Sequence, residues 1–324
     1  MRDSEINPVY VRLENGKVSA DDSTLTFSDV FNSDKPNSDL EFSFEERFEP
    51  FKQYVHGAYD GIDLVIGHQG KHLTALEVKL TVLPDQTTFK KAEAEWGSEL
   101  VIRPVTVVYA ALSIFHELKK NQTKLAEAKK ILEKAALDIS DWANITEIAG
   151  KKASIVDTLT KFFDKFEDIQ RPLIMQPVWK TKGKQAALSE HAFDIFIWSN
   201  MGLCKLFLEN ARNEKDGKVA SVSRYLRASA RLLRGLYELI TTQKLRTEEM
   251  LRMGLGNQTD KEFSASGRMT NALMKHARLE SPVIRQGTLK DLILRGGEKN
   301  LSPERRFDAT IYFTAAHVFD EENN

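Results

Sequence analysis

"GIDLVIGHQGKHLTALEVKLT", residues 61–81, contains two apolar runs that are joined by a short loop with two glycines. Apolar runs on both sides of such a loop predict a β-hairpin. Both runs nevertheless carry charge, because Asp63 lies in the first, and Glu77 and Lys79 lie in the second. The stretch therefore predicts a hairpin whose charges are either solvated on an open face or gathered around a metal ion.

The pairing of the two strands decides which side chains share a face. If residues 67–71 form the loop, Asp63 lies opposite Ala75, and Glu77 is one diagonal step away. Side chains alternate between the two faces of a strand, so these three residues and Lys79 share one face, while the other face is apolar. A shift of one residue would move Asp63 to the apolar face, and the pattern therefore favours this pairing.

The charged face has a chemical interpretation. Two carboxylates on one face repel each other, and a divalent cation compensates this repulsion. Oxygen ligands favour magnesium over zinc, and the small Ala75 leaves room for an ion. Lys79 could then hold or activate a water molecule beside a phosphate. The alternative is a solvated face on which Glu77 and Lys79 form an ion pair of little energetic consequence.

The rest of the first third is expected to be rich in strands. "NPVYVRLENGKVS" (7–19) predicts a hairpin that turns at Asn15-Gly16. In "LEFSFEERFEPFKQYV" (40–55), Phe44, Phe48 and Phe51 recur at helical spacing and predict a helix that Pro50 ends or kinks. The β-branched run at 101–108 predicts another strand. Strands separated by one helix indicate a core of the α/β or α+β class.

From about residue 110 the pattern becomes helical. Helices are expected at 110–137, 152–168, 185–213 and 218–246, with an internal linker at 171–185 and a late strand at Ala309–Thr314. We therefore expect a core at 1–115, a helical region at 116–256 that packs on it, and a C-terminal segment at 257–324, all within one domain.

Composition and charge limit the class of protein. The 324 residues are 41% hydrophobic and 29% charged, as in soluble globular proteins. No apolar run approaches the roughly 20 residues that span a bilayer, residues 1–16 contain no apolar segment of the signal-peptide kind, and Cys204 is the single cysteine. These features predict a cytoplasmic protein that has no membrane partner, no internal disulfide and no zinc site built on cysteine.

The charge is distributed unevenly along the chain. Residues 1–100 hold 19 acidic and 10 basic residues, whereas residues 217–252 hold 8 basic and 3 acidic residues. Arg224, Arg227, Arg231 and Arg234 follow one another at steps of three, four and three, which places them on one helix face. Such a face either contacts nucleic-acid phosphates or pairs with the acidic N-terminal third.

A resemblance to a known family gives the hairpin a specific meaning. Asp63, followed in the next strand by Glu77-Val78-Lys79, resembles the PD-(D/E)XK nuclease signature, with isoleucine instead of proline before the aspartate. "EFSFEERFEPFKQYVHGAYDGIDLVIG" (41–67) and "LEVKLTVLPDQTT" (76–88) further resemble type II restriction endonucleases of the HindVP family. The closer resemblance covers about residues 6–115.

The resemblance implies a mixed central sheet flanked by helices, with a large helical C-terminal part. It also implies a homodimer that uses Mg²⁺ to cut double-stranded DNA at a short symmetric sequence and leaves 5′-phosphate ends. A cognate DNA methyltransferase is the expected genetic neighbour of such an enzyme.

Site residues follow from the same resemblance. Asp63, Glu77 and the backbone carbonyl of Val78 would bind the metal, and Lys79 would orient or deprotonate the attacking water. An upstream helix often supplies a further acid, for which Glu45 is preferred over Glu49.

Lys90 and Lys91, which follow the hairpin, are candidates for contacts to the DNA backbone. Two other functions fit the sequence as well. One is a repair or recombination nuclease of the same superfamily, and the other is a helical DNA-binding or interaction protein without enzymatic activity.

Overall fold

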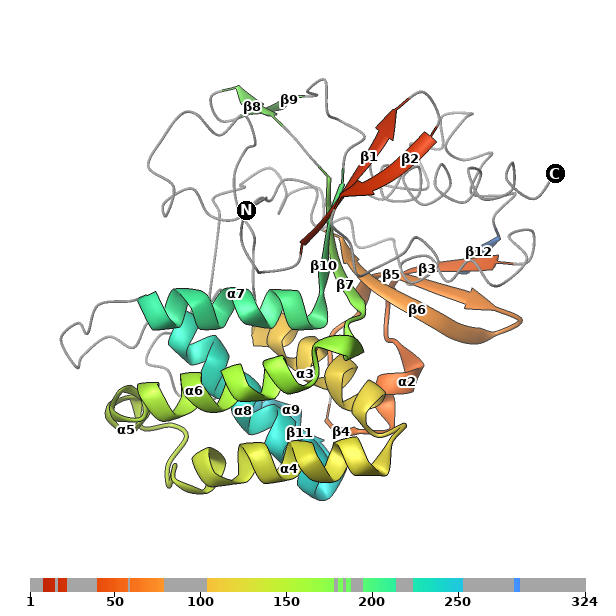
Figure 1. Cartoon of the computed structure of the whole chain (residues 1–324). Coiled ribbons are helices and arrows are strands. Elements are labelled where there is room, and N and C mark those ends of the chain that lie inside the picture. The colour runs from red at the N-terminus through yellow and green to blue at the C-terminus, as the bar shows by residue number, and fades with distance from the viewer. Residues whose placement is uncertain are drawn as a thin grey trace.

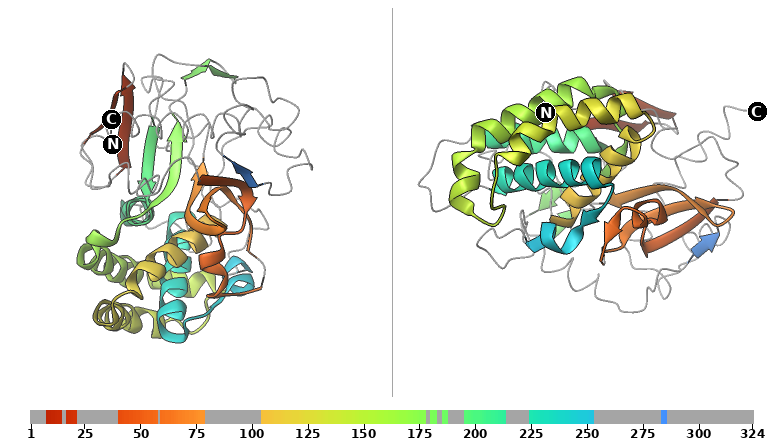
Figure 2. Two further views of the ribbon diagram at one scale, coloured as in Figure 1. Left: turned by 90° about the vertical axis from the view of Figure 1, so that its right-hand side faces the viewer. Right: turned by 90° about the horizontal axis from the view of Figure 1, so that it is seen from below.

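A computed structural model describes ten segments of the chain: 8–14, 17–21, 40–57, 59–78, 104–177, 180–182, 185–187, 195–213, 224–252 and 283–285. Figures 1 and 2 show a twisted sheet with the helices gathered below it. No helix in these segments is long and apolar enough to cross a membrane.

The main sheet has eight strands within the described segments, in the order β12-β3-β5-β6-β7-β10-β1-β2. Their bounds are β1 Pro8–Glu14, β2 Lys17–Asp21, β3 Leu40–Glu46, β5 Ile62–His68, β6 Lys71–Val78, β7 Pro172–Pro177, β10 Ile195–Ser199 and β12 Val283–Arg285. All neighbours are antiparallel except β6 and β7, which run parallel. The predicted mixed sheet is therefore confirmed.

Helices form the second layer. They are α2 Glu49–Lys52, α3 Pro104–Leu118, α4 Gln122–Leu137, α5 Ile145–Gly150, α6 Lys152–Lys165, the short 3₁₀ helix η2 Glu167–Ile169, α7 Asn200–Asn213, α8 Arg224–Thr242 and α9 Thr247–Arg252. The α/β class with a large helical part is confirmed. Two small sheets complete the description: β4 Val55–His56 pairs with β11 Leu245–Arg246, and β8 Lys180–Lys182 pairs with β9 Gln185–Ala187.

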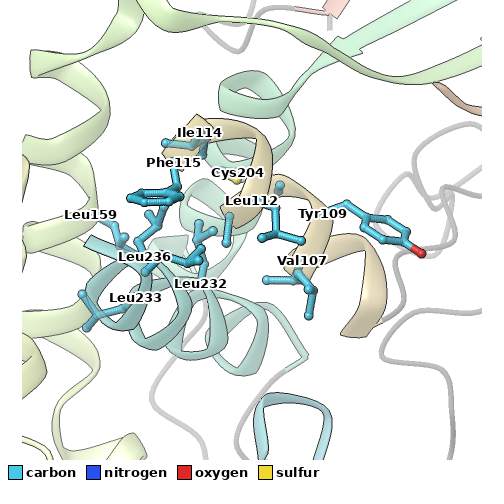
Figure 3. Close-up of a cluster of buried hydrophobic side chains, with 14 of the residues drawn as sticks. Val107, Tyr109, Leu112, Ile114, Phe115, Leu159, Cys204, Leu232, Leu233 and Leu236 are labelled. Carbon is cyan, nitrogen blue, oxygen red and sulfur yellow. The ribbon is translucent and has the colours of Figure 1, made fainter. Parts of the chain in front are cut away.

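Helix α3 lies at the centre of the helical layer and packs against α7 and α8. Every residue from Thr106 to Phe115 is buried, so this helix is covered on all sides. Figure 3 shows how Leu112 and Phe115 of α3 meet Leu232 and Leu236 of α8 in the hydrophobic core.

Two local predictions are wrong in an instructive way. Residues 104–108 belong to helix α3, although their β-branched side chains favour a strand. Burial of the whole helix outweighs this preference, and Pro104 at its first position suits a helix start. Residues 40–46 form strand β3 rather than a helix, because Leu40, Phe42 and Phe44 alternate into the interior and are fully buried.

The central part of the chain also differs from expectation. The predicted linker at 171–185 contains β7, whose buried Leu173 and Ile174 lie inside the sheet. The helix expected at 185–213 begins only at Asn200, after β9 and β10. The segments 1–115, 116–256 and 257–324 thus all contribute strands to one sheet.

Other expectations agree with the structure or cannot be compared with it. The N-terminal hairpin is confirmed, because Glu14 pairs with Lys17 and leaves Asn15-Gly16 between the strands. The helix expected at 110–137 is divided, since the Asn121 side chain caps α4 by accepting hydrogen bonds from the backbone of Thr123 and Lys124. The late strand predicted at Ala309–Thr314 lies outside the described residues.

Candidate active site

The hairpin formed by β5 and β6 turns more tightly than the sequence pattern predicts. Gln69 and Gly70 form a two-residue turn between the paired His68 and Lys71, and both turn residues have positive φ, 51° and 74°. Such a backbone matches the twist of a hairpin. One strand position further on, the register shifts, because Gly67 pairs with His72 but Ile66 pairs with Thr74; Leu73 is the extra residue of this bulge.

The tight turn and the bulge together change which acid faces which residue. Val65 pairs with Ala75, and Leu64 pairs with Leu76. The predicted pairing of Asp63 with Ala75 is therefore wrong. Continuing the observed register by one position places Asp63 directly opposite Glu77, instead of on a diagonal. Opposite residues of an antiparallel pair share a face, and their Cβ atoms lie about 4.5–5.5 Å apart.

The two acids differ in their exposure to solvent. Asp63 is 5% exposed, whereas Glu77 is half-buried. Val65 and Ala75, their neighbours on the same face, belong to the helical core or pack against it. Asp63 and Glu77 therefore lie on the face of the sheet that packs against the helices. A carboxylate this buried is costly unless a positive group or hydrogen-bond donors compensate it.

Glu45 lies at the same level of the sheet, on the other side of Asp63. Phe44 pairs with Leu64 and Glu46 pairs with Ile62, which leaves Glu45 beside Asp63. The prediction that Glu45 lies on a helix is wrong. It lies near the end of β3, where its φ is 54° and its side chain is exposed. Glu45, Asp63 and Glu77 therefore form one row across β3, β5 and β6.

Close backbone packing holds this row in place. A Cβ atom on Gly61 would lie 2.2 Å from the carbonyl oxygen of Glu45, so no larger residue fits there without a shift of the backbone. The left-handed backbone of Glu45 thus occurs where β3 packs tightly against Gly61, the residue before β5. Strained conformations of this kind cluster at functional sites.

Two neighbouring carboxylates fit the ligand preference of Mg²⁺, which binds through one or two carboxylates and keeps several waters. Val78, whose carbonyl was the third predicted ligand, ends β6 and pairs with Met175 of β7. Within the described segments, no group of three or more His, Cys, Asp or Glu side chains is gathered closely enough to hold a metal by itself. In this part of the chain, Asp63 and Glu77 are therefore the two carboxylates that share the acidic face of the hairpin.

Tyr109 of α3 is a site neighbour that sequence reasoning missed. Its hydroxyl donates to the carbonyl of Asp60 at 2.6 Å and lies 3.4 Å from that of Gly61. Burial, and then the negative charges of Glu77, Asp60 and Asp63, raise the pKa of Tyr109 above its ordinary value. No sequence motif marks this tyrosine, which lies in a uniformly apolar run just after the wrongly predicted strand.

Two arginines of α8, Arg231 and Arg234, contact residues of the helical layer. Arg231 is 2% exposed and donates from Nε to the carbonyl of Met250 at 2.8 Å. Burial, and then the charge of Arg227, lower the pKa of Arg231 to about 9. Arg234 forms an ion pair with Glu249 of α9 at 2.8 Å. These contacts argue against phosphate binding by Arg231 and Arg234.

The remaining predicted DNA contacts can be compared only in part. Arg227 is half-buried, and of Arg224 the structure describes only the backbone at the start of α8. Lys79, Lys90 and Lys91 lie outside the described residues.

Comparisons with known proteins identify the class to which this acidic hairpin belongs. The chain is 34% identical over 326 aligned positions to the type II restriction enzyme HgiDI of Herpetosiphon aurantiacus, with coverage of 99% of this chain and 88% of that protein. It is 33% identical over 304 positions to the probable type II restriction enzyme HindVP of Haemophilus influenzae, with coverage of 94% and 80%. No solved structure matches the chain.

These similarities place the chain in the class of restriction endonucleases. The family model for the HindVP restriction endonuclease matches residues 1–319, and the chain belongs to that family. The resemblance noted for residues 6–115 therefore extends over almost the whole chain. The prediction of an enzyme of the site-specific deoxyribonuclease class is confirmed.

Proposed function

We propose that this protein is a Mg²⁺-dependent type II restriction endonuclease that hydrolyses double-stranded DNA at a short symmetric sequence and leaves 5′-phosphate ends. The opposite placement of Asp63 and Glu77 on β5 and β6 supports this proposal most directly. Two relatives at 34% and 33% identity carry the name of type II restriction enzymes, which supports the substrate class.

In the proposed site, each residue of the PD-(D/E)XK pattern has a role. Asp63 and Glu77 hold the metal through their carboxylates, with the carbonyl of Val78 as a further ligand. When bound, Mg²⁺ polarises the scissile phosphate and stabilises the charge on the leaving oxygen. Lys79 orients the attacking water or takes its proton. Glu45, beside Asp63 in the same row, is the proposed auxiliary acid.

The products follow from the balance of the reaction. Water adds its oxygen to phosphorus, the bond between phosphorus and the 3′ oxygen breaks, and that oxygen is protonated. The phosphate then stays on the 5′ end. A homodimer with two-fold symmetry places two such sites on the two strands of a symmetric sequence.

DNA contacts of the proposed enzyme involve Lys90, Lys91, Arg224 and Arg227, which would bind phosphates. A cytoplasmic location belongs to the same proposal. So does a neighbouring gene for a cognate methyltransferase, because the enzyme would cut host DNA that is not modified.

Cleavage of plasmid and genomic DNA tests the proposal. Purified protein should produce discrete fragments with Mg²⁺ and none with EDTA, and sequencing of the ends should show a 5′-phosphate at one repeated symmetric site. Asp63→Asn and Glu77→Gln should abolish cutting, whereas Asp157→Asn, an exposed acid on α6, should cut like the wild type. Unchanged cutting by Glu77→Gln would refute the site assignment. Preference for branched or damaged DNA would instead favour a repair nuclease.

A further inference from the structure

Hydrogen bonds from two tyrosine hydroxyls hold the short segment 59–61, which directly precedes β5. Tyr59 donates to the carbonyl of Phe48 at 3.2 Å, which ties the segment to the residues after β3. Tyr109 reaches it from α3 and donates to the carbonyl of Asp60 at 2.6 Å. Both tyrosines are buried, with exposures of 5% and 2%. The start of β5 is therefore held from two independent elements.

The ring of Tyr109 is well anchored. It lies in the buried stretch of α3, between Val108 and Ala110, which are 1% and 0% exposed. Figure 3 shows that its hydroxyl points away from the cluster formed by Leu232 and Leu236. A buried hydroxyl needs a hydrogen-bond partner, and the carbonyls of Asp60 and Gly61 meet this need. Because the ring is buried with its helix, these bonds tie the backbone of residues 60 and 61 to α3.

The backbone held by Tyr109 is joined to both acids on that side of the site. Gly61 lies two residues before Asp63 in the same extended segment. It also touches the backbone of Glu45, since a Cβ atom on Gly61 would lie only 2.2 Å from the Glu45 carbonyl oxygen. A shift of the peptide between residues 60 and 61 would therefore move Asp63 along the sheet and release Glu45 from its neighbour.

We propose that Tyr109 is a positioning residue of the active site: its hydroxyl, through the carbonyls of Asp60 and Gly61, sets the place of Asp63 for metal binding and the place of Glu45 beside it. The proposal rests on the proposed function of Asp63 as a metal ligand. Ligands must be held to within about 0.5 Å of their productive geometry. Loss of an outer partner of a metal ligand typically costs about 10- to 100-fold in metal affinity or activity.

The variant Tyr109→Phe removes one oxygen atom and keeps the packed ring. Calorimetry with Mn²⁺ should show metal binding weakened by about tenfold or more, and half-maximal cleavage should require correspondingly more Mg²⁺. Hydrogen exchange should become faster for the amides of 59–63, which reports on the backbone without any metal. Tyr109→p-aminophenylalanine keeps a donor at the ring tip and should restore much of the affinity.

Tyr54→Phe is the matched control. Tyr54 is also buried, at 3% exposure, and its hydroxyl also meets α3, where it lies 3.1 Å from His116 Nδ1. Within the described residues its hydroxyl bonds to His116 and not to Asp60 or Gly61, so the variant should bind Mn²⁺ like the wild type. Because Tyr54→Phe also removes one buried hydroxyl, it measures how much of the change in Mn²⁺ binding of Tyr109→Phe comes from general destabilisation.

The outcomes separate the positioning role from the proposed function. Wild-type Mn²⁺ affinity in Tyr109→Phe, or an effect no larger than that of Tyr54→Phe, would overturn the role of Tyr109. Unchanged exchange of 59–63 would overturn it too. If instead Asp63→Asn binds Mn²⁺ and cuts DNA like the wild type, the proposed function itself fails, whatever Tyr109 does. Should Tyr109→Phe not fold, the p-aminophenylalanine variant gives the decision: weakened Mn²⁺ binding despite its retained donor would contradict the proposal.

Discussion

Asp63 of β5 and Glu77 of β6 take directly opposite positions when the pairing of Leu64 with Leu76 is continued by one residue. The relationship depends on two local features of the hairpin, the two-residue turn at Gln69-Gly70 and the extra residue Leu73. Together they bring the two acids to the same level of one pair of strands, at the side of the sheet that faces the helices.

Metal binding should be visible in the stability of the protein before any DNA is added. The variant Asp63→Asn removes one of two neighbouring negative charges, so its Tm in EDTA should equal or exceed that of the wild type. Addition of Mg²⁺ should raise the Tm of the wild type, since a ligand that binds only the folded state stabilises it. The Asn variant should not respond, and DNA cleavage should fall by at least about 100-fold. An equal Mg²⁺ response in both proteins would contradict the metal site.

Glu45 offers a test in which stability and activity move in opposite directions. Its φ of 54° is unfavourable for any residue other than glycine. Glu45→Gly should therefore raise the free energy of unfolding by about 1 kcal/mol, as measured with urea, whereas Glu45→Gln should leave it nearly unchanged. Both variants should cut DNA more slowly if the carboxylate is the auxiliary acid. Full activity in Glu45→Gln would remove this residue from the site.

The hairpin and its acidic face can be predicted from the sequence, because both follow from the alternation of side chains between the two faces of the strands within one short stretch. The sequence does not predict the register, because the alternation of side chains does not mark Leu73 as the extra residue of a bulge. The strand character of β7 was hidden by its two prolines, and the helical character of α3 by its β-branched residues. Burial within the whole protein decides these segments, and it also brings Tyr109 to Asp60 across 49 positions.

His116 predicts a loss of stability at mildly acidic pH. Its Nδ1 lies 3.1 Å from the hydroxyl of Tyr54, within hydrogen-bond distance. Burial, and then the charge of Lys120, lower the pKa of His116 below 6.5, although Glu117 opposes this shift.

The sign of the effect follows from the direction of the shift. The unfolded chain binds a proton at His116 more readily than the folded chain, so stability is complete above about pH 6.5 and declines as the pH falls. Urea unfolding at pH 7.5 and 5.5 should show a smaller difference for His116→Gln than for the wild type. An identical difference in both proteins would mean that His116 does not contribute.

The salt dependence of DNA binding should distinguish lysines that contact phosphates from arginines that serve the fold. Each phosphate contact contributes about 0.9 to the slope of log affinity against log salt concentration. Lys90→Gln and Lys91→Gln should each reduce that slope by about 1, as measured with Ca²⁺ or without metal to prevent cleavage.

Arg231→Met, in the helical layer, is the variant to compare with Lys90→Gln and Lys91→Gln. It removes the buried donor to the carbonyl of Met250, and a buried acceptor left without a donor costs about 1–3 kcal/mol of stability. The slope should nevertheless stay at the wild-type value, because a side chain with 2% exposure cannot release counterions from DNA. A slope that falls in Arg231→Met as it does in Lys90→Gln would show that α8 opens to the DNA when the complex forms.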